Sequence, residues 1–539
     1  MSVKRGVRRF DKWSLGSGGS MDLDSVEYNS VNGQVYENGT FGPRPGWKDF
    51  ATTDGTRVSD PSADTPMALQ WYRDTDDVEN LLVGFSDTGA SNDFTYDIVP
   101  LASGTYASGA VVDAEMGYTG KFQPPEWDDG THWSTWNDGF SLTSLGPYRA
   151  VAGSGTPGTF AASGVPPVRV QSVVYRDRTY AFSINSVPGR IYYSDAADYT
   201  TYQTASFFDV NAASASENGA VIGMWPVKNA LLIARKDDRW QVLTGVSPEN
   251  GTIRELGRDI VPNYNSAATL DNQLFFLQRN GQGVVVASPS FVETEALKHL
   301  SPTAYPASTQ VRPNTAFQPM KGISNEASSF LMLPGRNNGD DTTIVAVEQI
   351  NGVFNLSRWI HSAAVTDIFF TAGRPGEIYS MVDEGSVWQI YSRNETLNRP
   401  ANSGDGLSVA SSLENGVSGG SDVILDLGTI ESDDDNLLRP VKVVAVVDYW
   451  KGGNYAAPTL AIDATVSGID GDTPSDAAAQ VVVSSTSWDA STGDAPNTRR
   501  VSTSLPQLQW GTKAKIRLTF NNLAVDNVRV YYEEIDDIR

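Results

Sequence analysis

Short apolar runs separated by polar turns dominate the chain between Pro66 and Arg399. Most of these runs come in pairs that a short polar stretch connects, as at residues 176–178 and 236–238. Two apolar runs joined by such a turn predict a β-hairpin. The paired runs occupy residues 67–86, 132–144, 170–184, 220–245, 266–288, 328–350 and 365–383. The pattern therefore predicts an all-β protein.

The hairpins recur at a spacing that is typical of a repeat fold. Successive pairs are marked by Val83, Gly139, Tyr180, Leu232, Phe275, Leu331 and Phe369, which lie 56, 41, 52, 43, 56 and 38 residues apart. A β-propeller blade of four strands takes roughly 40–55 residues. Residues 61–400 are therefore predicted to form a β-propeller of about seven blades, and the uneven spacing leaves six or eight open. The Gly- and Ser-rich stretches within 102–167 are predicted to be loop excursions.

The first 60 residues are predicted to form an extended N-terminal arm. Residues 14–20 are rich in Gly and Ser, and a loosely alternating stretch follows them. A stiff corner then comes at Pro43, Arg44, Pro45, Gly46 and Trp47. Both prolines restrict φ, whereas the glycine permits conformations that other residues avoid. We expect this corner to direct the arm towards a neighbouring subunit, with Trp47 as its anchor.

The last part of the chain has a different spacing of strands. Residues 401–422 are rich in Gly, Ser and Asn and are predicted to be a linker. Beyond them, residues 423–539 contain seven strand candidates separated by short polar turns. That number and spacing predict a β-sandwich domain.

The charge of the chain limits its partners. Its 40 Lys and Arg residues face 64 Asp and Glu residues, for a net charge of −24, and it contains no cysteine. Such a chain repels polyanions, so DNA is expected to pass it without sequence-specific binding. The basic start, with Arg5, Arg8 and Arg9, is the exception. It is either a disordered solubilising tail or a peg for an acidic partner, and we favour the peg. The start lacks the apolar run of a secretion signal.

The sequence offers no catalytic, cofactor-binding or metal-binding set, so we expect neither an enzyme nor a cofactor. Residues 416–420 match a nucleophile-elbow pattern, but no histidine follows them, and residues 153–158 match a phosphate-loop pattern without a flanking strand and helix. The three histidines, His132, His299 and His361, are far apart. Asp470, Asp472 and Asp476 have a calcium-loop spacing but lack the later glutamate, so a solvated turn is favoured over a calcium site.

One aromatic stretch keeps a carbohydrate-binding alternative open. Trp127, Trp133 and Trp136 lie close in sequence to Glu126 and to two aspartates. Aromatic rings beside carboxylates are typical of a sugar-binding cleft, and paired carboxylates are what glycoside hydrolysis needs. The alternative interpretation, a blade hairpin with anchoring tryptophans, is favoured here.

The sequence resembles structural proteins of tailed-bacteriophage tails. Residues 18–47, with their Pro-Arg-Pro-Gly-Trp corner, resemble the N-terminal module of such proteins. Residues 190–210, 221–245 and 270–288 are similar to their central propeller blades, and residues 514–535 to the closing strands of their appended β-domain. The resemblance covers most of the chain as patterns of strands and turns.

The resemblance implies a virion protein. In short-tailed phages, proteins of this build form the tail nozzle or hub, usually a hexameric ring below the portal and adaptor, through which the genome is released. The implied partners are further copies of the chain, the tail adaptor, and a tail fibre or spike, with a host receptor as a further option. The alternative is a minor tail-tip protein of a long-tailed phage that contacts a receptor or glycan, with or without glycan-hydrolysing activity. The 102–167 loops are compact and no large appendage is visible, which weakens the receptor-contact role.

Overall fold

The computed structural model describes the strands and many of the connections between them. The described residues are 3–11, 13, 28–36, 38–44, 46–49, 57–58, 64–73, 79–87, 94–101, 107–113, 126–127, 132–135, 148–151, 158–159, 171–182, 187–197, 202–210, 219–245, 248, 251–258, 267–270, 273–277, 284–287, 293–297, 312–313, 321–324, 329–336, 342–350, 353–360, 368–372, 377–383, 388–394, 400, 422–432, 436–453, 455–467, 477–484, 488 and 495–535. Every named element among them is a β-strand, which confirms the predicted all-β class.

Five four-stranded antiparallel sheets follow one another along the first half of the chain. Each sheet pairs its strands in chain order. The strands are β7 (Asp64–Arg73), β8 (Glu79–Asp87), β9 (Phe94–Pro100) and β10 (Ala107–Asp113); β11 (Glu126–Trp127), β12 (His132–Thr135), β13 (Tyr148–Val151) and β14 (Gly158–Thr159); β15 (Gln171–Tyr175), β16 (Arg178–Phe182), β17 (Arg190–Tyr193) and β18 (Phe207–Asp209); β19 (Val221–Val227), β20 (Ala230–Arg235), β21 (Arg239–Thr244) and β22 (Thr252–Arg258); and β23 (Ala267–Leu270), β24 (Gln273–Leu277), β25 (Val284–Ala287) and β26 (Glu293–Leu297).

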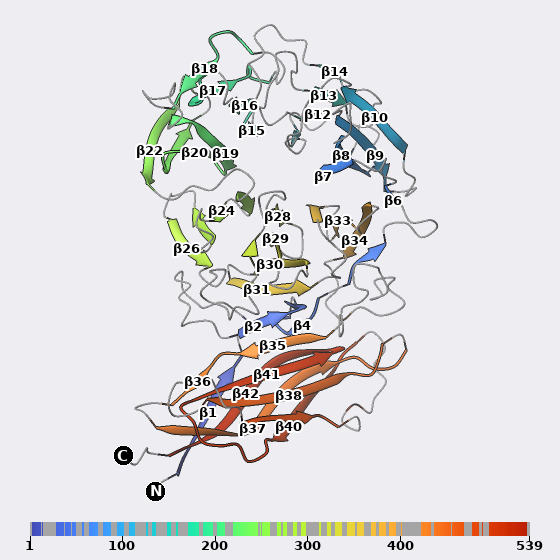
Figure 1. The fold of residues 1–539 in the computed structure, drawn as a ribbon, viewed down its shortest axis with the longest axis vertical. Helices are drawn as coiled ribbons and strands as arrows, with labels where there is room; N and C mark the ends of the chain where they lie inside the picture. Colours follow the sequence, from blue (N-terminus) through green and yellow to red (C-terminus); the bar gives the residue numbers. More distant parts are fainter. Residues whose placement is uncertain are drawn as a thin grey trace.

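Two further groups of strands complete this part. They are β27 (Arg312–Pro313), β28 (Lys321–Ser324), β29 (Ser329–Arg336), β30 (Thr342–Ile350) and β31 (Val353–Ile360), then β32 (Ile368–Ala372), β33 (Glu377–Asp383) and β34 (Trp388–Asn394). Figure 1 shows the groups from β7 to β34 following one another around a ring, called the ring below. The two hairpins predicted at residues 176–178 and 236–238 are present, with Arg176 and Asp238 at positive φ in the turns.

The sheet of β19 to β22 buries both of its faces against its neighbours in the ring. Every residue of β20 is buried. Leu231 and Ile233 belong to a cluster with side chains of β16 and β17, whereas Leu232 and Ala234 belong to a cluster with side chains of β24. Successive side chains of a strand point to opposite faces of its sheet. A sheet covered on both sides therefore needs the unbroken apolar run that β20 shows in its sequence.

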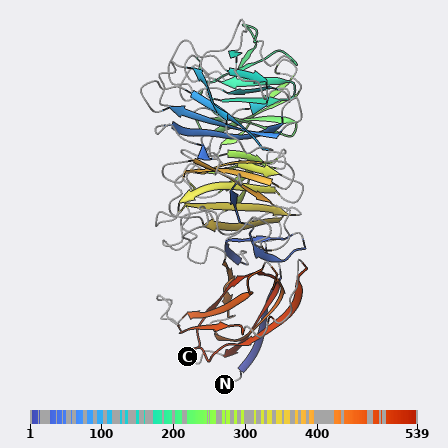
Figure 2. The ribbon, with the colours of Figure 1, turned by 90° about the vertical axis from the view of Figure 1, so that its right-hand side faces the viewer.

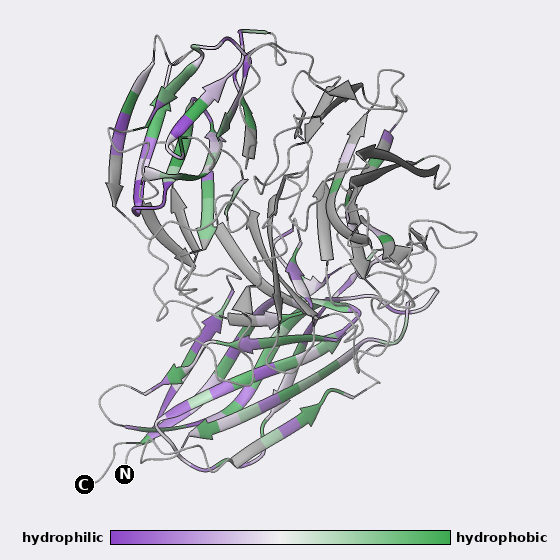
Figure 3. Cartoon of the chain, turned by 45° about the horizontal axis from the view of Figure 1, so that its top comes forward, coloured by the Kyte–Doolittle hydropathy of each residue, from purple (hydrophilic) through white to green (hydrophobic). Residues whose placement is uncertain are grey.

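The C-terminal part of the chain, residues 423–535, supplies strands to two sheets that pack face to face. One contains β37 (Leu437–Tyr449), β40 (Asn497–Ser504) and β42 (Leu523–Ile535); the other contains β35 (Val423–Leu427), β36 (Ile430–Glu431), β38 (Thr459–Ser467), β39 (Ala477–Val482) and β41 (Lys513–Asn521). Burial alternates along β38 and β41, and one cluster of buried residues takes side chains from both sheets. Figure 3 shows this alternation of hydrophobic and hydrophilic positions. Each of these sheets has one face on the shared core.

The N-terminal strands pair with both parts of the molecule. They are β1 (Val3–Phe10), β2 (Tyr28–Val31), β3 (Gly33–Val35), β4 (Phe41–Pro43), β5 (Lys48–Asp49) and β6 (Arg57–Val58). Strand β2 lies between β31 of the ring and β35 of the C-terminal part, so one eleven-stranded sheet spans both. Strands β1 and β4 pair with β42, and β5 and β6 pair with β34. In the side view of Figure 2, N-terminal strands in blue lie between the ring and the C-terminal part.

Several predicted features lie outside the described residues. They are residues 14–20, residues 401–421, Pro45, Trp136, His299, His361, residues 416–420 and the three aspartates Asp470, Asp472 and Asp476.

Candidate docking face

Strand β1 is the edge strand that carries the basic start of the sequence. It pairs antiparallel with β42 over its whole length, from Val3 opposite Ile535 to Phe10 opposite Val528. Only Phe10 of this strand is buried, in the core cluster. The side chain of Arg5 is 84% exposed and Val7 is 51% exposed. The predicted arm residues Arg5, Arg8 and Arg9 are thus held on a strand of the chain's own sheet, with their side chains in solvent.

Positive charge gathers on the outer face of this sheet. Val443, Ala445 and Val528 point into the core cluster, so the residues that alternate with them form the outer face. The register places six cations there, namely Arg5, Arg9, Arg439, Lys442, Arg500 and Arg529. Two carboxylates, Glu533 and Asp448, lie in the same rows. Asp526, at the bulge beside Asn527, and Asp11, which pairs with Arg9, lie next to these rows. We call the six cations the basic face, because they still outnumber the four carboxylates, in a chain whose overall bias is negative.

The facing sheet has no such excess on its own outer side. Arg517 lies between Asp426 and Asp463 in the register, and its guanidinium donates to both oxygens of Asp426 at 2.5 and 2.9 Å. These bonds raise the pKa of Arg517 above its ordinary value. Lys513 pairs with Glu431 at 2.5 Å. Here cations and carboxylates are matched, so the basic face is a local feature of the β1, β42, β37 and β40 sheet.

Glu533 holds the near half of β1 to the sheet. Its carboxylate accepts a hydrogen bond from Arg439 at 2.7 Å, and Arg5 lies 3.6 Å from its other oxygen. The guanidinium of Arg439 also lies over the ring of Trp510, at 4.6 Å from the centroid. The bond from Arg439 holds the pKa of Glu533 below its ordinary value, and the charge of Arg5 acts in the same direction. One carboxylate therefore connects three adjacent strands.

This linkage predicts an acid-sensitive β1. Because the pKa of Glu533 is lowered in the folded protein, its contribution to stability is complete above the carboxyl's ordinary pKa, about 4.3, and is lost as the pH falls through the folded-state value. Hydrogen exchange of the β1 amides should accelerate relative to the amides of β41 when the pH falls from 6 towards 3. The variant Glu533→Gln should exchange faster at pH 6 and lose this extra pH dependence. An equal pH response in both proteins would contradict the assignment.

The other half of β1 meets no carboxylate on β42. Arg8 lies opposite Val530, and Arg9 lies opposite Arg529. Like charges directly opposite each other on paired strands are unfavourable. Arg9 pairs with Asp11 at 2.8 Å, whereas Arg529 has no ion pair within the described part of the chain. The two halves of β1 thus differ, because β42 supplies a carboxylate to the half near Arg5 and none to the half near Arg9.

The predicted corner lies inside the molecule. Trp47 is fully buried at 0% exposure, and Gly46 is buried beside it. The guanidinium of Arg44 is also buried, with its Nε 3.4 Å from Asn32 Oδ1 and its charge 5.8 Å from the ring centroid of Trp359 in β31. Arg44 of the corner therefore contacts β31, the ring strand beside β2.

Two hydrogen bonds to backbone carbonyls fix the path of the chain at the corner. The hydroxyl of Tyr36 donates to the carbonyl of Pro43 at 2.9 Å, and the N–H of Arg44 donates to the carbonyl of Asn32 at 3.0 Å. The corner leaves β4, which pairs with β42, and leads into β5, which pairs with β34. The corner is a joint between the C-terminal part of the chain and the ring.

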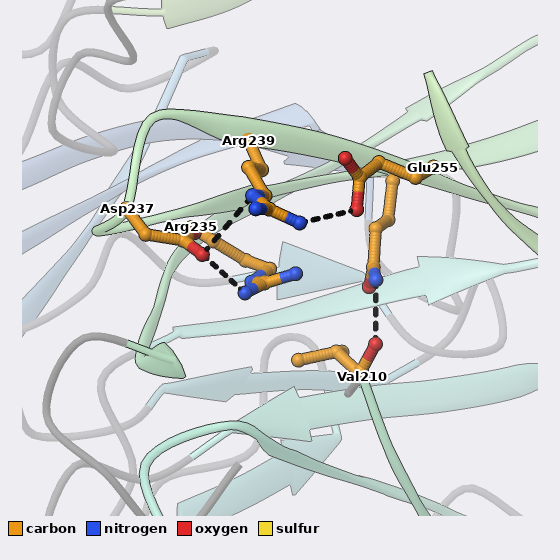
Figure 4. A network of polar contacts seen from close by, with 6 residues as sticks. Val210, Arg235, Asp237, Arg239 and Glu255 are labelled. Carbon is orange, nitrogen blue, oxygen red and sulfur yellow. Dashed lines mark hydrogen bonds and ion pairs between the residues drawn. The ribbon is translucent and has the colours of Figure 1, made fainter. Parts of the chain in front are cut away.

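Sequence reasoning overlooked a polar contact between two sheets of the ring (Figure 4). Arg235 is 3% exposed and forms an ion pair with Asp237 in the β20–β21 turn. Burial lowers the pKa of Arg235, against the effect of the Asp237 charge. Arg239 pairs with Glu255 at 2.9 Å, and the amide of Gln241 donates to the carbonyl of Val210, on the preceding sheet, at 2.5 Å. The one signal in the sequence was an arginine at the end of a continuous apolar run.

The tryptophans proposed for sugar contact are partly described. Trp127 in β11 and Trp133 in β12 are register partners on neighbouring strands, and Glu126 is the partner of Ser134. The described residues contain no group of three or more His, Cys, Asp or Glu side chains placed to hold a metal ion. No helix long and apolar enough to cross a membrane occurs in the part of the chain that the structure describes.

No protein-family model and no curated protein matches the sequence. Solved structures that are similar to the chain include a virginiamycin B lyase from Staphylococcus aureus, at 10% identity and a TM-score of 0.39 over 62% of this chain and 98% of that one. BamB from Moraxella catarrhalis is similar at 11% identity and 0.33 over 63% and 92%. BBS1N in complex with ARL6DN is similar at 14% identity and 0.40 over 66% and 98%. All are β-propeller proteins from unrelated sources, and at TM-scores below 0.5 this likeness says nothing about what the chain does.

Proposed function

We propose that this protein is a structural protein of a bacteriophage tail, in which several copies form a ring, the nozzle or hub. In this proposal the ring of sheets is a seven-bladed β-propeller and the C-terminal part is a β-sandwich. The seven successive groups of strands around the ring and the core shared by the last two sheets support this architecture. The copies would continue the DNA channel below the portal and adaptor and gate genome release.

The basic face is the observation that carries the proposal. A chain with net charge −24 has acidic surface to present, and a second copy would meet the six cations of the basic face with that surface. Complementary charge directs association and fixes orientation. A contact between two different surfaces of identical chains is heterologous, and such contacts close into a ring when the rotation permits it. An acidic adaptor protein would bind by the same chemistry.

The sheet that spans the molecule supports a mechanical role. Strand β2 is hydrogen-bonded to strands on both sides, so the sheet that shares a core with the basic-face sheet continues into the ring. The buried corner residues Pro43, Arg44, Gly46 and Trp47 add a connection from the basic-face sheet, because β4 pairs with β42 and β5 pairs with β34. A subunit that docks through one end and lines a channel with the other needs the two ends fixed relative to each other.

The excess of acidic residues suits a conduit. Like charge keeps a polyanion from binding to a wall, so DNA would pass without sequence-specific contacts. The protein would then be located in the virion tail and would act without a cofactor. The binding of a tail fibre or spike belongs to the same proposal.

Electron microscopy of the purified protein, alone and mixed with its neighbouring virion proteins, tests this function. We expect closed rings with a central channel in at least one of the two samples. Reversing two charges of the basic face with Lys442→Glu and Arg500→Glu should raise the concentration needed for assembly by about tenfold or more. The matched control, Lys513→Glu on the facing sheet, should assemble normally.

Two results would overturn the proposal. Persistent monomers in both samples would favour a peripheral tail protein that contacts a receptor or glycan. Equal assembly of the Lys442→Glu, Arg500→Glu variant and the unchanged protein would remove the basic face from the contact. Release of sugars from host glycans by the pure protein would indicate the hydrolytic alternative.

A further inference from the structure

We propose that the free edge of β1 accepts an extended acidic segment of a partner protein as an added β-strand. The inference deepens the proposed function, because the partner would be a neighbouring virion protein, but the binding chemistry stands on β1 alone. Among the described residues, β1 pairs with β42 on one side and with no strand on the other. An edge strand with open backbone groups is a template for a further strand.

The side chains of β1 select the partner by charge. The strand reads Val3-Lys4-Arg5-Gly6-Val7-Arg8-Arg9-Phe10, which is twice the order apolar, basic, then basic. All four basic residues are exposed. Like charges opposite each other destabilise strand pairing, so a second β1 is rejected, whereas carboxylates opposite these positions are favourable. The occupant is therefore an acidic strand and not the same edge of another copy.

Strand β42 shows how an acidic strand matches β1. Reading along β42, Glu533, Glu534 and Ile535 lie opposite Arg5, Lys4 and Val3. Two successive acidic residues followed by an apolar residue are thus the complement of one half of β1 in the antiparallel direction. Because β1 repeats its order after four residues, the complement of the whole strand repeats the order acidic, acidic, apolar, any residue.

The half of β1 near Arg9 is where a partner would contribute most, because β42 supplies no carboxylate to it. Arg9 faces Arg529 across the pairing, and Arg8 faces the apolar Val530. A carboxylate opposite Arg9 on the free edge would add to the charge of Asp11 in offsetting the repulsion between Arg9 and Arg529. The exposed Val7 would be covered by the apolar residue that follows. Affinity would come from backbone bonds and specificity from this order of side chains.

A peptide binding experiment tests the proposal on the full-length protein. The probe is a blocked, fluorescent peptide that reads Thr-Glu-Glu-Val-Thr-Glu-Glu-Val-Thr, and its binding is followed by anisotropy at low salt. Two further peptides have the same sequence with N-methyl groups on alternate backbone nitrogens. In one of them the methyl groups block one edge of the extended peptide, and in the other they block the opposite edge. We expect the plain peptide to bind, and at least one methylated version to lose about tenfold or more in affinity. Equal binding of all three would show plain charge attraction and would overturn strand addition.

Variants of the protein locate the contact. Arg8→Glu with Arg9→Glu should weaken peptide binding by about tenfold or more. The new carboxylate at position 9 would face Arg529, which favours the β1–β42 pairing, so a loss of binding would not reflect a loss of β1. The matched control is Lys513→Glu with Lys515→Glu, which makes the same change of charge at exposed positions of β41 on the facing sheet and should leave peptide binding unchanged. Equal loss in both variants would overturn a contact at β1.

Hydrogen exchange on the unchanged protein gives an independent measure. The plain peptide should slow exchange of amides within residues 3–10, and no added protection there would contradict the proposal. Competition by single-stranded DNA that displaces the peptide completely at equal charge would identify a polyanion surface and would also overturn it. The peptide assay does not require the protein to assemble into a ring. If rings form but the peptide does not bind, only the added strand is refuted. Peptide binding without rings refutes only the nozzle function.

Discussion

Replacing Trp47 with alanine should lower the free energy of unfolding by about 3–5 kcal/mol. Trp47 is fully buried in the joint between the ring and the C-terminal part of the chain. Removal of a buried indole loses its transfer free energy and leaves a cavity that a close-packed interior fills only in part. Denaturant unfolding followed by circular dichroism measures the change as a shift of the midpoint.

Two matched variants separate packing from other effects of this change. Trp47→Phe keeps a ring in the joint and should cost clearly less than Trp47→Ala. Val7→Ala removes a side chain that is half exposed, and it should change stability by less than about 0.5 kcal/mol. A small effect of Trp47→Ala, similar to that of Val7→Ala, would show that the corner is not part of a packed joint.

Replacing Gly511 with alanine should lower the free energy of unfolding by about 1–3 kcal/mol. A Cβ atom at this position would collide with the backbone carbonyl oxygen of Ser467, at the end of β38. Gly511 also exchanges two hydrogen bonds with Leu438, of 2.7 and 3.1 Å, which connect the segment before β41 to β37. Because backbone and not a flexible side chain occupies the space, relief requires β38 or this segment to move.

The neighbouring surface residue provides the control for this change. Gln509 is exposed, and Gln509→Ala should leave stability within about 0.5 kcal/mol of the unchanged protein. Thermal unfolding of the two variants side by side measures the difference. If Gly511→Ala unfolded at the same temperature as Gln509→Ala, the close approach of residue 511 to β38 would be refuted.

The parts of the fold that sequence predicted are those in which neighbours along the chain pair with each other. The hairpin of β15 and β16 and that of β20 and β21 join strands across two or three polar residues, so local patterns contain the information. The alternation along β38 and β41 likewise indicates one buried face. The four strands of each sheet from β7 to β26 follow from the same reasoning, because these sheets pair their strands in chain order, whereas the pairing of β34 with β5 and β6 joins distant parts of the chain.

The candidate docking site was predicted in composition but not in position. The basic residues Arg5, Arg8 and Arg9 stand out in an acidic chain, and their sequence is enough to suggest an acidic partner. Their place on the edge of β42, and the addition of Arg439 and Lys442 to the same face, depend on pairings between residues that are far apart along the chain. No local pattern specifies such a register, because many strands of similar composition compete for it.

The sequence by itself determined the all-β class, the hairpins of the ring, the excess of negative charge and the stiffness of the corner, because each of these depends on residues that are close along the chain. Only the tertiary structure decided where that corner lies. Val31 pairs with Arg358 on one side and Ile424 on the other, so a segment that resembles a free arm becomes a strand inside a larger sheet. Its backbone groups need partners, and the nearest open strand edges belong to residues far away in sequence, which only the folded chain brings together.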